Sequence, residues 1–578
     1  MIVPMKRLFL LCVADEAERT LAALRDLNVA HLDLTAAPGA ATGPAKERLE
    51  QAERAVRIVQ KAQREWAAPV AAKAALAVDE VLTLDVQREK LKGEAETLRS
   101  TIRRYAPFGD FDPALARRLE AVGVKLLLRD DGSYELLYGD ETAAEHPGTH
   151  AVPLPAERLS VTQERLSATE HEIDAVTEKI ASADVEAIIR SVPELRDAVA
   201  FAAAKDELAA NRVDGVMSGD SAPQISLVRG WVPVDGVTAV SMAAKANGWG
   251  IALRDPSADE TPPTLIRPPK LFRPVVALFN GLGIAPAYRE ADVSVPFMCY
   301  FSLFFAMLVG DGGYGAIILA LTLLGWRKYR ASAQRAPLMR SWLTLLTVFS
   351  VATVAWGALS NTWFGAGLPF AAEWPTVKWL GDPTYNNMML LCFTIGVSHL
   401  MLARIWTGFC MLNDRTCLSQ FGWAGIVLFM YLVTNSIVGI FSGIPEWAYW
   451  MFGVSLVLVF GFTLKGNELK SRGIELGMLP LNIMSALGDI ISYVRLFAVG
   501  LASVKVAQNF NDMAMGLDLP LGLKVVPMVL ILLVGHGLNF AMAGLSILVH
   551  AVRLNTLEFS NHKGISWAGY AFSPFKKH

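Results

Sequence analysis

The chain has 578 residues, is 53% hydrophobic and carries a net charge of −2, with no basic stripe that would favour nucleic-acid binding. Five scattered cysteines without paired spacing predict free thiols rather than a disulfide framework or a metal site, and no cofactor is expected. The mean hydropathy of +0.35 averages two different halves. Residues 1–290 are charged and rich in alanine, whereas residues 291–578 contain apolar runs long enough to span a bilayer. We therefore predict a soluble domain followed by a multi-pass cell-membrane domain.

The soluble half begins and ends with short strand-helix-strand patterns. One runs from Lys6 to Leu34 and the other from Ile225 to Arg254. Two units of this length can combine into a ferredoxin-like sandwich. The pattern predicts a proximal lobe made from residues 1–40 and 215–265. Because the first residues, Met1–Arg7, lack the long apolar core of a signal peptide, this half is expected to stay in the cytoplasm.

Two long helical stretches lie between these units, and apolar residues recur on them at every seventh position. The positions are Leu84, Leu91, Leu98 and Tyr105 on the outgoing stretch, and Leu159, Leu166, Ile173 and Ile180 on the return. Sustained heptads with charged flanks, Arg88 among them, predict an antiparallel coiled-coil hairpin over residues 44–108 and 155–212. Pro69 is expected to interrupt the outgoing helix. An ordinary helical bundle is the alternative.

A small distal lobe is predicted between the two helices, at residues 109–154. Val124–Arg129 and Ser133–Tyr138 flank Asp-Asp-Gly at 130–132, a pattern typical of a β-hairpin. The soluble half is therefore predicted as an α+β dumbbell, with two small α/β lobes joined by a coiled coil. The sequence contains no phosphate loop, HExxH or GxSxG motif. We expect a non-catalytic arm that holds other proteins.

The second half is predicted to be all-α. Apolar runs lie near residues 295–325, 341–365, 388–411, 420–441, 448–464, 478–510 and 521–553. Gly310-Asp-Gly-Gly313 divides the first run, and a cluster of cations places the following loop in the cytoplasm: Arg327, Lys328, Arg330, Arg335 and Arg340. Because the soluble half and this loop both lie on the cytoplasmic side, the chain must cross the membrane an even number of times between them. Continuing the count along the chain predicts about eight membrane helices, of which the last two are long and tilted.

Arg495 lies in the middle of the next-to-last apolar run and Arg553 near the end of the last. An arginine at bilayer depth costs at least ~2.5–3.5 kcal/mol and usually faces a counter-charge or a water-filled path. We therefore predict that this half moves or gates ions. Other polar residues on or beside the same two segments are half-channel candidates: Asp489, Ser492, Ser503, His536, Asn539, His550 and Glu558.

Structural roles remain open alternatives for several of these residues. Arg553 could pair with Glu558 near a helix end, and His536 and Asn539 could be hydrogen-bond partners between helices. Asp489 could serve helix packing.

Four motifs together resemble one known family along essentially the whole chain. Ser492–Ala502 (Ser-Tyr-Val-Arg-Leu-Phe-Ala-x-Gly-Leu-Ala) and His550–Phe559 (His-x-x-Arg-Leu-x-x-x-Glu-Phe) are similar to its two arginine motifs. Phe305–Gly315 is similar to its first membrane motif and Gly230–Pro233 to a signature of its soluble domain. The family is subunit a of vacuolar-type rotary ATPases, called subunit I in bacterial and archaeal enzymes. The length favours a bacterial or archaeal member.

The resemblance implies a stator subunit that stands beside a rotating proteolipid c-ring. Two half-channels reach mid-membrane from opposite sides, and Arg495 favours the charged form of a ring carboxylate so that the carboxylate releases its H⁺ or Na⁺. The soluble arm would hold the peripheral stalks, next to a central-stalk or ring-cap subunit and the soluble ATPase sector. Eukaryotic members often carry a glutamate and a histidine where Ala543 and Ser503 stand here.

Two rival classes follow from the same residues. A secondary transporter would often show internal membrane repeats, and none is evident in the sequence. A membrane-anchored coiled-coil scaffold would have no need of arginines on the two final helices. Whether the complex makes or consumes ATP is left open by the sequence.

Overall fold

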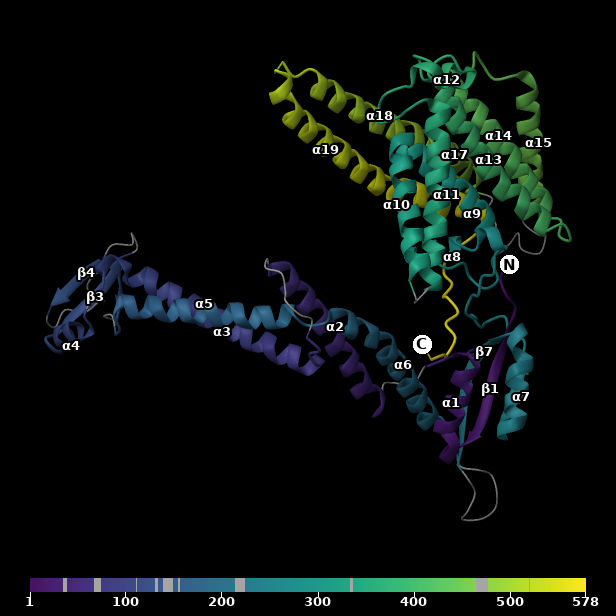
Figure 1. Cartoon of the computed structure of the whole chain (residues 1–578). Helices are drawn as coiled ribbons and strands as arrows, with labels where there is room; N and C mark the ends of the chain where they lie inside the picture. Colours follow the sequence, from purple (N-terminus) through teal and green to yellow (C-terminus); the bar gives the residue numbers. More distant parts are fainter. Residues whose placement is uncertain are drawn as a thin grey trace. The chain divides into compact units, whose positions relative to one another are not determined.

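The computed structural model describes the chain except for residues 35–38, 67–73, 111, 130–133, 139–148, 154–155, 214–223, 333–335, 464–476, 519 and 578. The chain divides into two compact units (Figure 1). The membrane unit consists of Met1–Lys6 and Asp255–Ser573, and the arm unit consists of Arg7–Arg254 and residues 574–578. The predicted boundary at residue 290 falls inside the membrane unit.

The two strand-helix-strand patterns of the arm unit share one sheet. The first comprises β1 (Met5–Val13), α1 (Ala17–Leu27) and β2 (His31–Leu32); the second comprises β7 (Ile225–Pro233), α7 (Val237–Asn247) and β8 (Gly250–Arg254). The strand order is β2-β7-β1-β8, and the short β6 (Arg212–Val213) pairs with β7. The two patterns therefore interleave, as a ferredoxin-like sandwich requires. Gly230 permits this pairing, because a Cβ there would lie 2.5 Å from the carbonyl oxygen of His31 on β2.

Four long helices also belong to the arm unit: α2 (Thr42–Glu65), α3 (Val78–Tyr105), α5 (Leu159–Ala181) and α6 (Val185–Ala210). α2 packs against α6, and α3 lies alongside α5 (Figure 1). Ion pairs fix the α3–α5 pair as antiparallel, with Arg99 2.6 Å from Glu170 and Lys179 3.4 Å from Glu80. The outgoing stretch, predicted as one long helix, consists of α2 and α3, and the return stretch consists of α5 and α6. Pro69, which was expected to interrupt the outgoing helix, lies outside the described residues.

Arg88 was expected on the charged flank of the coiled coil, and this expectation was wrong. Its side chain is 2% exposed, and its Nη2 lies 2.6 Å from Asp85 Oδ1 on the same helix. Glu65 of α2 lies 3.8 Å from Nη1. Arg88 is buried because α2 also packs against α3 and brings Glu65 close to the guanidinium.

The distal lobe contains α4 (Pro113–Ala121), β3 (Val124–Arg129), β4 (Tyr134–Tyr138) and β5 (Thr149–Val152). The predicted hairpin is confirmed, because β3 and β4 pair antiparallel with Val124 opposite Tyr138. Its turn residues lie outside the described part of the chain. β5 pairs with the other edge of β3.

The membrane unit is built from helices. They are α8 (Val275–Leu282), α9 (Ser294–Val309), α10 (Gly312–Ala331), α11 (Pro337–Ser360), α12 (Pro375–Leu380), α13 (Asn386–Cys410), α14 (Cys417–Ile437), α15 (Glu446–Phe462), α17 (Leu479–Ile491), α18 (Val494–Met515) and α19 (Leu521–Ser546). Within the described residues, five helical segments are long and apolar enough to cross a membrane, or six if the bent pair α9–α10 is one span. The eight crossings therefore remain a prediction.

The break inside the first apolar run is confirmed. The helix direction bends by 120° between α9 and α10, and Gly310 ends α9 with a φ of +69°, where glycine is favoured. Asp311 caps α10, accepting the N–H of Gly313 at 2.7 Å. Its carboxylate also accepts the N–H groups of Phe364 and Gly365, at 2.8 and 2.7 Å. Asp311 therefore holds the bend against the segment that follows α11.

The last two apolar runs form the longest segments of the unit. α17 and α18 together cover Leu479–Met515, and the helical segment from Leu523 to Lys563 has 41 residues, about twice the ~20 needed to cross a bilayer. α18 and α19 run side by side in Figure 1. After α19 the chain continues as two π-helical segments, η8 (Ile547–Ala551) and η9 (Leu554–Phe559), and then as α20 (Ser560–Lys563).

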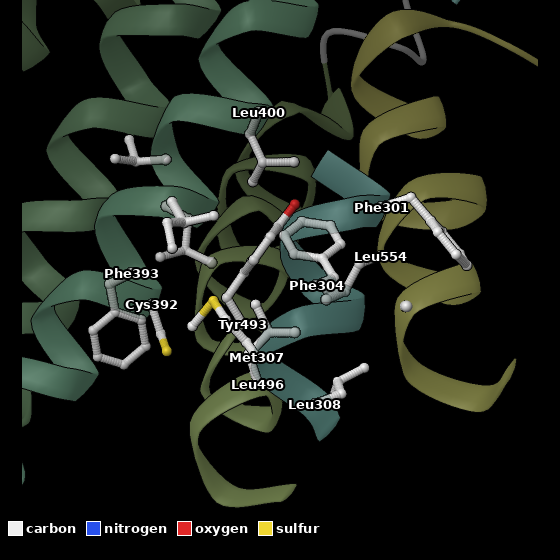
Figure 2. Close-up of a cluster of buried hydrophobic side chains, with 14 of the residues drawn as sticks. Phe301, Phe304, Met307, Leu308, Cys392, Phe393, Leu400, Tyr493, Leu496 and Leu554 are labelled. Atoms are coloured by element: carbon white, nitrogen blue, oxygen red, sulfur yellow. The ribbon is translucent and has the colours of Figure 1, made fainter. Parts of the chain in front are cut away.

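An apolar cluster holds these two segments to the rest of the membrane unit. Buried side chains from α9, α13, α18 and η9 meet in one cluster, shown in Figure 2. Tyr493, in the short break between α17 and α18, lies in this cluster near Phe304 and Leu554. The core therefore lies directly beside the turn that precedes Arg495.

Candidate functional site

Both predicted arginines contact the same carboxylate. Glu558 Oε1 lies 2.7 Å from Arg495 Nη2 and 3.4 Å from Arg553 Nε. The Glu558 side chain is 4% exposed, whereas Arg495 and Arg553 are 22% and 55% exposed. The Ser492 hydroxyl lies 3.2 Å from the same oxygen. Four of the residues singled out in the sequence therefore form one cluster, which we call the arginine cluster.

Local backbone geometry sets this arrangement on both sides. Arg495 Nε donates to the carbonyl oxygen of Ser492 at 2.8 Å, which orients the guanidinium at the first turn of α18. Arg553 and Glu558 are five residues apart, which in an α-helix would turn them roughly 140° away from each other. The wider π-helical turn of η9 brings i and i+5 onto one side. One carboxylate can therefore contact both cations.

A second cluster contains Asp489. Its Oδ2 accepts the Nε2–H of His562 at 3.0 Å, while Arg404 Nε donates to His562 Nδ1 at 3.1 Å. These three residues line a cavity of about 530 Å³ together with Asn482 and Ser485. We call this the aspartate cavity. Asp489 therefore has a charged environment of its own and does not join the arginine cluster.

A third set of polar residues lies farther along α18 and α19. Asn539 donates through Nδ2 to the Tyr314 hydroxyl at 3.0 Å and to the Ser503 carbonyl oxygen at 2.8 Å. The Tyr314 hydroxyl also lies 2.8 Å from His536 Nδ1, and His536 Nε2 lies 3.1 Å from Asn511 Oδ1. These side chains form a continuous hydrogen-bonded chain, which we call the tyrosine network. It joins α10, α18 and α19.

His550 belongs to none of the three clusters. It lies on η8, and its Nδ1 is buried without a hydrogen-bond partner among the described residues. The other eight candidates fall into the three clusters. The predictions from sequence did not include Tyr314, Arg404, Asn511 and His562, which the structure places in these clusters. Arg404 and Tyr314 carried the usable signal, since each is a polar or charged side chain inside an apolar run.

Comparisons with known proteins agree on one family. No protein-family model matches the chain. The chain is 34% identical over 374 residues to a V-type ATP synthase subunit I from Borreliella burgdorferi, covering 61% of this chain and 60% of that protein. It is 28% identical over 630 residues to V-type ATP synthase subunit I 1 from Treponema pallidum, covering all of both chains.

An archaeal relative shows the same likeness. An A-type ATP synthase subunit I from Methanocaldococcus jannaschii is 28% identical over 392 residues, covering 60% of this chain and 54% of that protein. The Borreliella and Methanocaldococcus matches thus span less than two thirds of those proteins, whereas the Treponema match is full length. The relatives that match this chain are thus subunits I of V-type and A-type ATP synthases from bacteria and archaea, and one of them matches over the whole chain.

Proposed function

We propose that this chain is the non-catalytic stator subunit that conducts ions beside the rotating proteolipid ring of a V/A-type ATP synthase. The observation that carries the proposal is the arginine cluster, in which two cations on the two long final segments share the single carboxylate of Glu558. A purely structural ion pair needs one cation for one carboxylate. The second arginine leaves the cluster with an excess positive charge.

This excess charge suits a site that a ring carboxylate passes. Arg495 uses Nη2 for Glu558 and Nε for Ser492, and its Nη1 has no hydrogen-bond partner among the described residues. A ring carboxylate arriving there would be held in its charged form and would release its ion. Because a bare carboxylate cannot enter lipid, it must bind a new ion before it rotates onward, which couples rotation to transport.

The two remaining clusters supply ion routes that reach Arg495 from opposite sides of the membrane. On the α17–α18 segment, Asp489 of the aspartate cavity precedes Arg495, whereas Ser503 of the tyrosine network follows it. We assign them to the two half-channels. The cations that precede α17 in the sequence place its start on the cytoplasmic side. The aspartate cavity then serves the cytoplasmic half-channel and the tyrosine network serves the outer one.

The arm unit has a holding role in this proposal. Its two lobes would engage the peripheral stalks, and the central-stalk or ring-cap subunit and the soluble ATPase sector would be further partners. Supporting this role, the arm consists of small sheets joined by long paired helices with many exposed ion pairs. In this assembly the arm would face the cytoplasm and the membrane unit would lie in the cell membrane.

The test compares wild type with Arg495→Ala and Arg495→Lys in ATP-driven ion uptake by vesicles that carry the whole complex. We expect Arg495→Ala to abolish uptake while the complex still assembles. The Arg495→Lys variant should retain little ion uptake, because lysine lacks the planar guanidinium that contacts Ser492 and Glu558 together. Full uptake by the alanine variant would refute the proposal.

A further inference from the structure

His399 is a buried polar residue that the mechanism above does not use. It lies on α13, is 0% exposed, and its Nδ1 is 2.9 Å from the Tyr493 hydroxyl. Its ring stacks between Tyr300, at 4.0 Å between centroids, and Phe559, at 4.5 Å. One side chain from a neighbouring helix therefore contacts both final segments.

Both contacts adjoin the arginine cluster. Tyr493 lies in the two-residue break between α17 and α18, just before Arg495, and Phe559 directly follows Glu558. Arg495 takes its orientation from the carbonyl of Ser492, the other residue of that break. A shift of the Tyr493 side chain would therefore move the backbone that aims the guanidinium. A shift of Phe559 would move the Glu558 carboxylate.

The local packing makes these contacts tight. Gly396 lies one turn before His399 on α13, and a Cβ there would be 2.7 Å from the Tyr493 ring. α13 can therefore approach the break closely only with glycine at this position. Tyr493 lies in the apolar cluster of Figure 2, so its hydroxyl needs a buried hydrogen-bond partner, and His399 supplies it.

A packing role alone does not account for a histidine here. His399 Nε2 is buried and has no hydrogen-bond partner among the described residues. A buried polar atom without a partner is costly, and a phenylalanine would fill the same stack without that cost. The hydrogen bond to Tyr493 is the contact that phenylalanine could not make.

We infer that His399 is a positioning residue that holds the segments bearing Arg495 and Glu558 at their pairing distance. The inference rests on the proposed function, because it concerns the geometry of that site. His399 itself touches neither arginine. It acts through Tyr493 on one side and through Phe559 on the other.

The experiment separates the hydrogen bond from the stack in the intact complex, using ATP-driven ion uptake into vesicles. His399→Phe keeps a flat ring and removes the hydrogen bond, and Tyr493→Phe removes only the hydroxyl oxygen. We expect each to lower uptake about fivefold, the effect of one buried hydrogen bond, with assembly unchanged. The double variant should be no worse than either single one, because both changes remove the same contact.

Rescue and a matched control complete the design. His399→Asn offers an amide N–H near the position of Nδ1 and should recover uptake to within about twofold of wild type. Tyr431→Phe also removes a tyrosine hydroxyl bonded to α13, through Thr394 at 2.9 Å, but away from the arginine cluster. Its uptake should equal wild type.

The outcomes distinguish this inference from the proposed function. Wild-type uptake by Tyr493→Phe, or additive losses in the double variant, overturns the positioning role even if His399→Phe fails to assemble. Arg495→Ala is measured in parallel. If that variant is inactive while His399→Phe and Tyr493→Phe pump normally, only the role of His399 fails. If Arg495→Ala pumps, the proposed function fails as well.

Discussion

At the scale of single residues, the membrane unit depends on the carboxylate of Glu558. It is nearly buried, yet it pairs with two arginines that remain partly exposed. Its second oxygen, Oε2, is buried with no hydrogen-bond partner among the described residues. Removing a partner from a buried ion pair costs about 3–5 kcal/mol, whereas exposed pairs are worth about 1 kcal/mol or less. The free-energy cost of removing the Glu558 carboxylate should lie between these two limits.

Replacing Glu558 by glutamine should therefore lower the stability of the assembled complex by about 2 kcal/mol, because two cations lose their counter-charge. The measurement is the thermal unfolding midpoint of the purified complex in detergent. Glu373→Gln is the matched control, since Glu373 pairs with Lys378 but is 81% exposed. We expect its effect to stay within about 0.5 kcal/mol. Equal midpoints for Glu558→Gln and wild type would contradict the shared-carboxylate interpretation.

At the scale of elements, the joint between the proximal lobe and the arm helices depends on a carboxylate from a distant part of the chain. Asp206 of α6 accepts the N–H groups of Gly39, Ala41 and Thr42, at 2.9, 3.1 and 2.8 Å, where α2 begins. The hydrogen bond from the Thr42 hydroxyl, together with these backbone bonds, lowers the pKa of Asp206 despite some opposing desolvation. α6 thus caps the start of α2.

The lowered pKa fixes the direction of the pH dependence. A carboxylate whose pKa is lower in the folded state stabilises the fold above its ordinary pKa of about 3.9, and the stabilisation disappears as the pH falls through the folded value. Asp206→Asn should speed hydrogen exchange of the amides of residues 39–42 about fivefold at pH 7. The ratio to wild type should persist at about pH 5 and vanish only below the ordinary pKa.

Hydrogen–deuterium exchange with mass spectrometry measures this ratio in the intact protein. Asp174→Asn is the control, because Asp174 is an exposed carboxylate on α5. Faster exchange at residues 39–42 in the control, or none in Asp206→Asn, would show that Asp206 does not cap α2.

At the scale of the whole molecule, the number of crossings decides which side each half-channel opens to. About eight crossings place the segment between α11 and α13 and the turn after α18 outside, and the end of α10 inside. In a variant with the five cysteines replaced, Glu373→Cys and Asp518→Cys should react with an impermeant maleimide on intact cells. Lys328→Cys should react only after permeabilisation. Labelling of Lys328→Cys on intact cells would refute this orientation.

Much of the architecture was predictable from the sequence because its signals are local. The Gly310-Asp-Gly-Gly313 break, the distal hairpin and the apolar segments each depend on residues close together in the chain. The buried position of Arg88 was missed for the opposite reason. Heptad spacing describes one helix pair, whereas Arg88 is covered by α2, which belongs to the other pair.

The same contrast between local sequence signals and contacts of distant segments holds for the residues around Arg495. An arginine inside an apolar run is expensive wherever it occurs, so Arg495 and Arg553 were recognisable from the chain alone. That both reach Glu558, that Asp489 instead pairs with His562, and that His399 contacts both final segments depend on how α13, α18 and the π-helical segment pack together. Bilayer insertion acts on each segment separately, whereas the partners of a buried polar group are chosen only when distant segments meet.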